Sequence, residues 1–420
     1  MSDFLLKTFF EKERWENAIQ TGIEKEIDPV LLRELCSPER RVELYHQIRD
    51  GKYEVAPPHE ALIPKDDGTF RTVYVNEGMD RVILAIINDM FFELCPELVH
   101  PCCTSYQKGI GCGKIVQKAS TIIKNAAGPT IGMKADLSKY FDSVPIQFID
   151  EVFDYIENKF GKSKLMDVVR NYYHMNAVID INKNLIEKYS SLRQGCAIAA
   201  FLADAVLYDI DDKISKLDVY YVRYSDDILI IGNEWEKGYK ILAEMLEQKS
   251  LILNPKKVEI LQKDRWFKFL GFTIKNNKIS LSKSRIKSFQ KEIEKRTIEG
   301  NTRDEKQIIN AVYHYLYKGC GEYSWATSVL PIINVDKDIN TLNGFVMDAI
   351  RAAMTGKHRI GGLGVTTDSP ECTISRGTGR HVKSNKMSIP HLDDYRVTMM
   401  CMKNAICTSK EAYTTLTSVI

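Results

Sequence analysis

The sequence lacks the features that mark membrane, secreted and zinc-binding proteins. No apolar run approaches the roughly 20 residues of a membrane-spanning helix, and the N-terminal segment MSDFLLKTFFEKERW has charges where a signal peptide has a long apolar stretch. The ten cysteines are scattered between Cys36 and Cys407 without a CxxC pair, and the eight histidines include no HExxH motif. We therefore expect a soluble cytoplasmic protein with reduced thiols, no membrane partner and no zinc or nuclease site.

The sequence also has little net charge. Its 58 Lys and Arg residues and 56 Asp and Glu residues leave only +2, so nucleic-acid binding would depend on local basic surfaces rather than on overall basicity. The contents of 44% hydrophobic and 27% charged residues are ordinary for a globular protein, and no repeat or low-complexity tract is visible. A chain of 420 residues with this composition is expected to bury a large core in two to four subdomains.

The first part of the chain predicts helices followed by a hairpin. Residues 1–50 have apolar residues at helical spacing, and two segments begin with an Asp or Ser cap followed by proline. From Tyr53 the pattern changes to alternating β-branched and aromatic residues around Asp67-Gly68, which predicts a β-hairpin. The segment DRVILAIINDMFFELCPELV then predicts a buried helix that ends near Pro96.

The middle of the chain alternates strands and helices. A strand over residues 130–137 precedes a helical region over 146–175, and SLRQGCAIAAFLADAVLYDIDDKI predicts a turn that enters an apolar helix. YVRYSDDILIIG then predicts a hairpin, the following segment predicts a helix and a strand, and RWFKFLGFTIKNNKISLS predicts another hairpin. This order indicates an α+β fold, with an antiparallel or mixed sheet covered by helices on one face.

Two adjacent carboxylates, Asp226 and Asp227, stand at the tip of the hairpin predicted in YVRYSDDILIIG. Neighbouring like charges are unfavourable when buried, because desolvation and repulsion both disfavour the charged forms, and a divalent cation compensates them. Asp136 ends the strand TIGMKAD and would face this tip if the two strands were neighbours. Three carboxylates would then hold two Mg²⁺ ions, which activate a 3′-hydroxyl and stabilise a leaving pyrophosphate. An isolated Asp-Asp pair is more often a solvated turn, so this hypothesis depends on the flanking motifs.

The flanking motifs resemble those of bacterial reverse transcriptases, in the same order, over most of residues 53–275. ADLSKYFDSV resembles the first palm motif, LRQGCAIAAFLADAVLY resembles the Gln-Gly motif that opens a palm helix, and YSDD is similar to the catalytic hairpin. LNPKK and FLGF resemble the two motifs that follow, the second being the primer grip. The resemblance implies a right-hand polymerase of fingers, palm and thumb with an antiparallel palm sheet. It divides the chain into a helical N-terminal extension (1–50), fingers and palm (51–275), a thumb (276–350) and a basic, helical and loop-rich C-terminal region (351–420).

The resemblance also assigns metal ligands. They are Asp136, Asp226, Asp227 and the carbonyl of Leu137, with two Mg²⁺ ions, or alternatively Mn²⁺, as cofactors. Asp142 matches an acid common in the bacterial enzymes and is expected to be structural. Phe141 occupies the steric-gate position, where an aromatic ring would collide with a ribose 2′-OH and so favour deoxynucleotides. The alternative for Phe141 is a core aromatic residue of the palm.

The same resemblance assigns contacts to the nucleotide. Lys65 and Arg71 flank the predicted fingers turn and match residues that meet the triphosphate, and Gln194 and Gly195 match residues that line the nucleotide and the template base. Lys257 matches a lysine proposed to protonate pyrophosphate. The alternative for the three cations is a solvated surface charge. The segment RQGCA departs from the PQGSP of many relatives, so this loop is expected to differ in shape.

Nucleic-acid contacts are expected after the primer grip. SLSKSRIKSFQKEIEKR predicts a helix with apolar residues on one face and basic residues on the others, typical of a thumb helix that follows a template–primer backbone, although a solvated amphipathic helix has the same pattern. The expected contacts are Lys283, Arg285, Lys287 and Lys291 from this helix, and Arg376 and Arg380 from the basic region. QKGIGCGKI has Lys108 and Ile115 where a phosphate loop requires Gly and Ser or Thr, and instead resembles a fingers segment that contacts template.

The expected function is RNA-directed DNA polymerase. The partners would be a structured, cognate non-coding RNA as template, deoxynucleoside triphosphates and the cDNA product. Chain length and the added C-terminal region resemble the defence-associated reverse transcriptases, with their second class as a candidate, more than retron or group II intron enzymes, which implies an antiphage role. Two alternatives stay open, an RNA-dependent RNA polymerase and a catalytically silent RNA-binding module. The sequence does not specify the template, the priming group or the oligomeric state.

Overall fold

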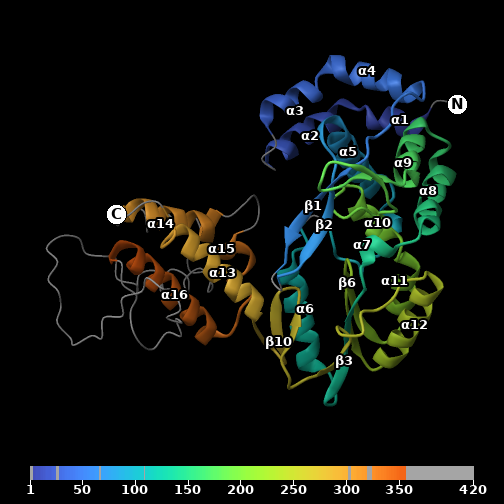
Figure 1. Ribbon diagram of the computed structural model, residues 1–420. Helices are drawn as coiled ribbons and strands as arrows, with labels where there is room; N and C mark the ends of the chain where they lie inside the picture. Colours follow the sequence, from blue (N-terminus) through green and yellow to red (C-terminus); the bar gives the residue numbers. More distant parts are fainter. Residues whose placement is uncertain are drawn as a thin grey trace, which may run out of the picture. The chain divides into compact units, whose positions relative to one another are not determined.

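The computed structural model describes residues 3–24, 28–65, 68–107, 109–300, 304–318 and 324–355, which form two compact units (Figure 1). The first unit comprises residues 1–110 and 126–262, and the second comprises residues 111–125 and those from 263 onward. The predicted contacts Arg376 and Arg380, the rest of the basic C-terminal region and the turn residue Asp67 lie outside the described residues.

Four helices form the N-terminal part of the first unit, as the sequence predicts. They are α1 (Phe4–Phe9), α2 (Lys12–Glu24), α3 (Pro29–Leu35) and α4 (Pro38–Arg49). The side chains of Asp28 and Ser37 accept hydrogen bonds from the first-turn amides of α3 and α4, each with proline at N1. Trp15 is buried and donates its indole N–H to the carbonyl of Phe9. This extension shares the hydrophobic core of the unit.

The palm sheet has four strands in the order β6-β7-β3-β8. The strands are β3 (Thr130–Asp136), β6 (Val219–Tyr224), β7 (Asp227–Gly232) and β8 (Glu259–Gln262). β3 lies between β7 and β8 and is antiparallel to both. The predicted hairpin and the antiparallel palm sheet are therefore confirmed, and β3 is the direct neighbour of the hairpin strand β7.

Helices pack around this sheet and extend the core. They are α5 (Gly78–Leu94), η1 (Pro96–Leu98), α7 (Tyr140–Ser143), α8 (Ile146–Phe160), α9 (Lys164–His174), α10 (Ala199–Ala205), α11 (Tyr208–Ser215) and α12 (Trp235–Gln248). α12 contacts β3 and β7, while α11 contacts β6. The helical region expected over residues 146–175 is two helices, because Ser163 begins a new one by accepting a hydrogen bond from the amide of Leu165 (3.1 Å).

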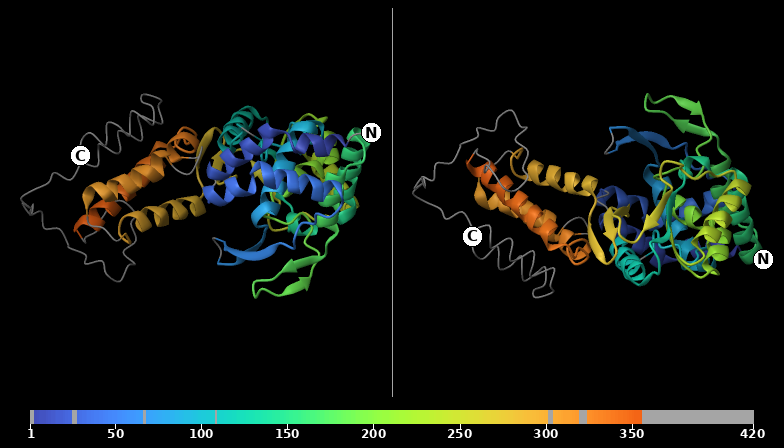
Figure 2. Two further views of the ribbon diagram at one scale, coloured as in Figure 1. Left: turned by 90° about the horizontal axis from the view of Figure 1, so that it is seen from above. Right: turned by 90° about the horizontal axis from the view of Figure 1, so that it is seen from below.

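A second sheet in the first unit has the order β2-β1-β4-β5. Its strands are β1 (His59–Pro64), β2 (Phe70–Val75), β4 (Ala177–Ile179) and β5 (Leu185–Glu187). β1 and β2 form the predicted fingers hairpin. The β4–β5 hairpin has no counterpart in the sequence prediction, since each strand is only three residues long. The two hairpins project from the unit in the same direction (Figure 2).

The second unit combines a small sheet with helices. The strands β9 (Phe267–Phe269), β10 (Phe272–Lys275) and β11 (Lys278–Leu281) form an antiparallel sheet, in which β10–β11 is the predicted hairpin and β9 a third strand. The helices are α6 (Cys112–Asn125), α13 (Lys283–Arg296), α14 (Glu305–Tyr313), η2 (His314–Lys318), α15 (Trp325–Ser328) and α16 (Asp336–Thr355). No helix in the described part of the chain is long and apolar enough to cross a membrane.

Candidate active site

The four predicted metal ligands lie together at one end of the palm sheet. Asp136, the last residue of β3, is paired in the ladder with Asp227, the first residue of β7. Asp226 immediately precedes Asp227 in the hairpin turn. The amide of Leu137 donates to the carbonyl oxygen of Asp226 (3.2 Å), which fixes the end of β3 to this turn. Residues about 90 positions apart in the sequence are thus brought to one place by the strand register.

Burial and like charge act on these carboxyl groups together. Burial and, after it, the charges of Asp226 and Asp136 together raise the pKa of Asp227 to about 6. The pKa of Asp226 is also raised, first by burial and then by Asp136. Carboxyl groups that oppose one another's ionisation form a site with excess negative charge, which a cation relieves.

Lys257 supplies one positive charge to this cluster. Its Nζ lies 2.7 Å from Oδ2 of Asp136, where the lysine side chain is 57% exposed and the carboxyl side chain 11%. The turn that carries Lys257 is anchored at the same place, because the amide of Asn254 donates to the carbonyl oxygen of Asp136 (2.8 Å). Lys257, which is expected to contact pyrophosphate, therefore forms an ion pair with Asp136 of the acid cluster.

The donor set fits a hard divalent cation, although the side chains do not form a finished metal cluster. Within the described ranges, no three His, Cys, Asp or Glu side chains are arranged to hold a metal ion. Carboxylate and backbone carbonyl oxygens are nevertheless ligands that Mg²⁺ takes, and the raised pKa values of Asp226 and Asp227 show the charge that it would neutralise.

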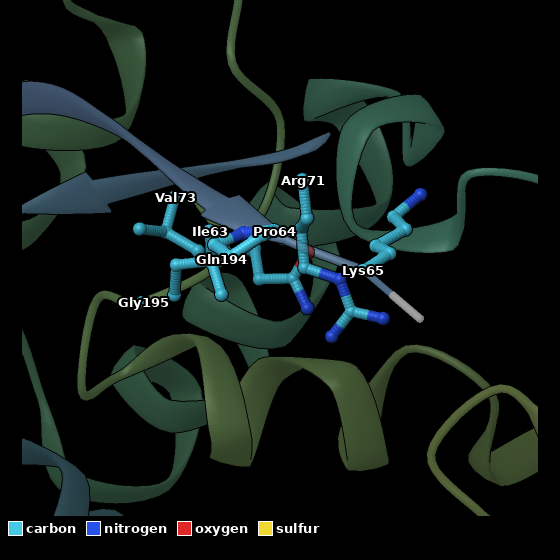
Figure 3. Close-up of a pocket in the computed structure, with 7 residues that line it drawn as sticks. All are labelled: Ile63, Pro64, Lys65, Arg71, Val73, Gln194 and Gly195. Carbon is cyan, nitrogen blue, oxygen red and sulfur yellow. The ribbon is translucent and has the colours of Figure 1, made fainter. Parts of the chain in front are cut away.

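A cleft of about 520 Å³ brings together four of the predicted nucleotide contacts (Figure 3). Its lining consists of Ile63, Pro64, Lys65, Arg71, Val73, Gln194 and Gly195. Lys65 and Arg71 come from the fingers hairpin and lie toward one end, whereas Val73 and Gly195 lie toward the other. An apolar wall with two exposed cations at one end suits a molecule with a flat base and an anionic phosphate chain.

Gly195 allows the loop before α10 to approach the fingers hairpin. Its φ is +104°, and an added Cβ would lie 2.9 Å from the carbonyl oxygen of Tyr74 and 3.2 Å from Cβ of Val73. The amide of Tyr74 donates to the carbonyl oxygen of Gln194 at 2.7 Å. Glycine is required here because backbone atoms occupy the space of a side chain.

The departure in this loop, Arg193, is part of the core. It is only 1% exposed, and its guanidinium carbon lies 4.1 Å from the ring centroid of Tyr172. Its Nε donates to Oγ of Ser190 (2.9 Å). A stacked and buried arginine therefore fixes the loop immediately before Gln194.

Phe141 and Asp142 lie on α7, close in sequence to Asp136. The half-buried ring of Phe141 packs edge-on against Tyr140, with 5.7 Å between ring centroids. Its carbonyl oxygen accepts from the amide of Leu192 (3.1 Å), which joins α7 to the loop that carries Gln194. Burial raises the pKa of Asp142, while nearby cations that include Lys65 and Arg71 lower it.

The basic residues of α13 separate into two groups. Lys283, Lys287 and Lys291 are exposed and recur every four residues, so they form one stripe along the helix. Arg285, which is predicted to contact phosphate with them, is half-buried, and its guanidinium carbon lies 4.6 Å from the ring centroid of Phe272 and 5.7 Å from that of Trp325. Arg285 thus packs within the second unit, whereas the lysines face solvent.

The sequence did not lead us to predict a buried ion pair between β6 and α11. Arg223 of β6 is fully buried and donates three hydrogen bonds to Asp211 of α11, from Nη2 to Oδ2 at 2.6 Å and from Nε to Oδ1 and Oδ2 at 2.9 and 3.0 Å. The hydroxyl of Tyr221 donates to Oδ1 of Asp211 (2.6 Å). An arginine inside the apolar strand VYYVRY was the available signal, because a buried guanidinium requires a buried acid.

Comparisons with known proteins give a family and two structural neighbours. A model of the family described as reverse transcriptase (RNA-dependent DNA polymerase) matches residues 63–274. No curated protein matches the sequence. A telomerase from Candida albicans, solved with a TWJ fragment of telomeric RNA, has a TM-score of 0.42 and 11% identity over 73% of this chain and 61% of its own. An apo telomerase from Candida tropicalis, truncated from its C-terminal domain, has a TM-score of 0.42 and 15% identity over 54% and 56%. The chain spans less than two thirds of either telomerase chain.

Proposed function

This chain belongs to the reverse transcriptase (RNA-dependent DNA polymerase) family, and from that membership we propose that it synthesises DNA on an RNA template. The observation that carries the proposal is the pairing of Asp136 with Asp227 in the palm sheet, directly beside Asp226 and inside the matched residues. Three acids of this kind at the end of an antiparallel sheet are a suitable site for nucleotidyl transfer.

The proposed mechanism uses two divalent ions, Mg²⁺ or Mn²⁺. Asp136, Asp226, Asp227 and the carbonyl of Leu137 would hold them, and the ions would activate the primer hydroxyl and stabilise the leaving pyrophosphate. The carboxyl groups must be ionised for this role, and Asp227, with a pKa of about 6, is mostly ionised at neutral pH. Lys257 leaves Asp136 in this scheme and becomes available to pyrophosphate.

The cleft at the fingers hairpin is proposed to hold the nucleotide. Lys65 and Arg71 donate to the triphosphate, while the loop of Gln194 and Gly195 faces the base. Phe141 is proposed to exclude the ribose 2′-OH. If it does not, an RNA-dependent RNA polymerase is the alternative function. Phe141→Ala is expected to raise ribonucleotide incorporation relative to deoxynucleotide incorporation. An unchanged ratio in single-turnover incorporation would remove the gate assignment.

The template is proposed to be a structured non-coding RNA, bound through the lysine stripe of α13 and the basic C-terminal region. The exposure of Lys283, Lys287 and Lys291 supports the first contact. The sequence resemblance to defence-associated reverse transcriptases, of their second class, supports a cytoplasmic antiphage role. Sequencing the nucleic acid that co-purifies with the protein tests these proposals, because it identifies the template and any covalent primer together.

Primer extension tests the polymerase proposal directly. The wild-type protein is assayed on an RNA template with deoxynucleoside triphosphates and Mg²⁺, beside Asp226→Ala and a control, Asp212→Ala, in which a half-buried acid of α11 that pairs with Lys216 is removed. We expect DNA synthesis by the wild type and the control only. Equal synthesis by Asp226→Ala would defeat the mechanism, and RNA binding without synthesis by the wild type would favour the silent RNA-binding module.

A further inference from the structure

The turn that carries Asp226 contains a backbone conformation that needs support. Ser225 has a φ of +57°, in the left-handed region that glycine adopts freely and serine adopts at a cost. Such a residue persists where its surroundings fix both of its peptide groups. Two contacts do this, because the amide of Ser225 donates to Oγ of Ser105 (3.0 Å) and its carbonyl oxygen accepts from Nη1 of Arg223 (3.2 Å).

Ser105 holds the turn from a distant part of the chain. It is fully buried and lies 120 residues before Ser225 in the sequence. Its Oγ also lies 2.6 Å from Oδ1 of the buried Asp204, to which the hydroxyl donates, and 3.2 Å from Sγ of Cys103. A hydroxyl can donate to a carboxylate while it accepts from an amide, whereas an alanine side chain can do neither. Ser105 therefore connects α10, which carries Asp204, to the turn.

The loop that carries Ser105 is itself fixed to the hairpin. Arg223 donates its amide to the carbonyl oxygen of Cys102 (2.9 Å), and Thr104 donates its amide to the carbonyl oxygen of Arg223 (2.9 Å). These bonds pair the loop with the edge of β6. Thr104 directly precedes Ser105, and Arg223 lies two residues before Ser225. Two backbone hydrogen bonds to Arg223, on the β6 side of the turn, thus place the Ser105 hydroxyl beside the amide of Ser225.

We propose that Ser105 is a positioning residue for the acid pair. Its hydroxyl holds the amide of Ser225, keeps the turn in its left-handed conformation and so sets the directions in which Asp226 and Asp227 point. The inference rests on the proposed polymerase function and extends it to a residue outside the motifs that carry the metal ligands.

Steady-state kinetics test this assignment. Ser105→Ala is expected to lower kcat about 10- to 100-fold, because the Ser225 amide loses its buried acceptor and the carboxyl groups lose their orientation, while KM for the nucleotide changes less than about threefold. Ser163→Ala is the matched control, since Ser163 is also a buried serine whose Oγ accepts from a backbone amide, at the start of α9. It is expected to keep the wild-type kcat. A wild-type kcat in Ser105→Ala would overturn the proposal.

A second substitution tests the cause of the loss. Glycine at position 225 adopts a positive φ without help, so Ser225→Gly in the Ser105→Ala background is expected to raise kcat by about tenfold over Ser105→Ala alone. A purely structural role for Ser105 predicts no such recovery. A double variant that is as slow as Ser105→Ala, or slower, contradicts the proposal.

Hydrogen exchange gives a readout that does not depend on catalysis. In Ser105→Ala the amide of Ser225 is expected to exchange about tenfold faster or more, with no change in Ser163→Ala. If the wild type makes no DNA but this exchange difference is found, the polymerase function fails and the positioning role stands. If the wild type makes DNA and the exchange is unchanged, the positioning role fails.

Should Ser105→Ala not fold, Ser105→Thr and Ser105→Val replace it. These two side chains have nearly equal shapes and differ in the hydroxyl, so equal kcat values for the pair reject the proposal.

Discussion

Two groups of acids, one buried and one half-buried, lie near the β6–β7 hairpin, and their charges are balanced differently. Asp211, beneath the hairpin, receives a bidentate guanidinium from Arg223 and the hydroxyl of Tyr221. At the hairpin tip, Asp226 and Asp227 have raised pKa values, and Lys257 is bonded to the neighbouring Asp136. The first group is a completed ion pair, while the second retains excess negative charge.

This difference separates structural acids from acids that are kept for a ligand. A buried carboxylate with a full set of partners supports the fold, and breaking its ion pair leaves an unpaired charge. Buried carboxyl groups that raise one another's pKa weaken the fold unless a cation binds, which is common at functional sites. The exposed lysines of α13 and the packed Arg285 show the same contrast for positive charge.

The largest effect is expected at the tip. Asp227→Asn should lower primer extension at least about 1000-fold, because a metal ligand loses its charge. In the metal-free protein the same change should raise the free energy of unfolding by about 1 kcal/mol, because like charges no longer oppose one another. Primer extension and thermal unfolding in EDTA measure the two effects. Asp212→Asn, which removes only the charge of a half-buried acid paired with Lys216 on α11, should alter neither by a comparable amount. A lower melting temperature for Asp227→Asn would mean that Asp227, like Asp211, stabilises the fold.

The completed ion pair should respond in the opposite way. Asp211→Ala should lower the free energy of unfolding by about 3 kcal/mol, because the buried Arg223 loses its bidentate partner and keeps only the longer ion-pair contact to Asp204 (3.9 Å). Denaturant unfolding of Asp211→Ala, beside Asp212→Ala at the half-buried neighbouring position, measures this difference. A loss below about 1 kcal/mol would show that the guanidinium finds other partners.

The pH dependence sharpens the comparison, since Asp227 has a pKa of about 6. Protonation competes with the cation, so Mg²⁺ affinity should fall toward tenfold per pH unit below pH 6. In the metal-free protein the raised pKa means that the folded state binds this proton more tightly than the unfolded state. The contribution of Asp227 to stability should therefore decrease as pH rises from the ordinary carboxyl range to about 6, and then stay constant. Calorimetric Mg²⁺ titration between pH 5 and 8 measures the predicted change in Mg²⁺ affinity. A constant affinity over this range would argue against Asp227 as a ligand.

The smallest effect is expected on α13. Lys287→Gln with Lys291→Gln should weaken binding of an RNA–DNA duplex a few-fold and reduce the salt dependence by about one to two phosphate contacts. Arg285→Gln should instead lower stability, because its guanidinium packs on aromatic rings. Fluorescence anisotropy over a range of salt concentrations measures the slope. An unchanged slope in the double lysine variant would mean that the stripe is only a solvated helix face.

Local patterns predicted most of the elements and the identity of the acids. The capped helices before residue 50, the fingers hairpin, β3 and the β6–β7 hairpin follow from periodicity, capping and turn residues, which act over a few positions. The acids were recognisable because two adjacent charges interrupt apolar strands. The short β4–β5 hairpin was missed, since three-residue strands carry no measurable alternation.

What the sequence determined by itself was therefore most of the elements, their order and the acids at the ends of two strands. The tertiary structure decided that Asp136 stands opposite Asp227, that Lys257 lies on Asp136 and that Ser105 reaches Ser225. It also separated Arg285 from the lysines of the same helix. These contacts join residues far apart in the chain, and they depend on sheet order and register, which the local spacing of apolar residues does not encode.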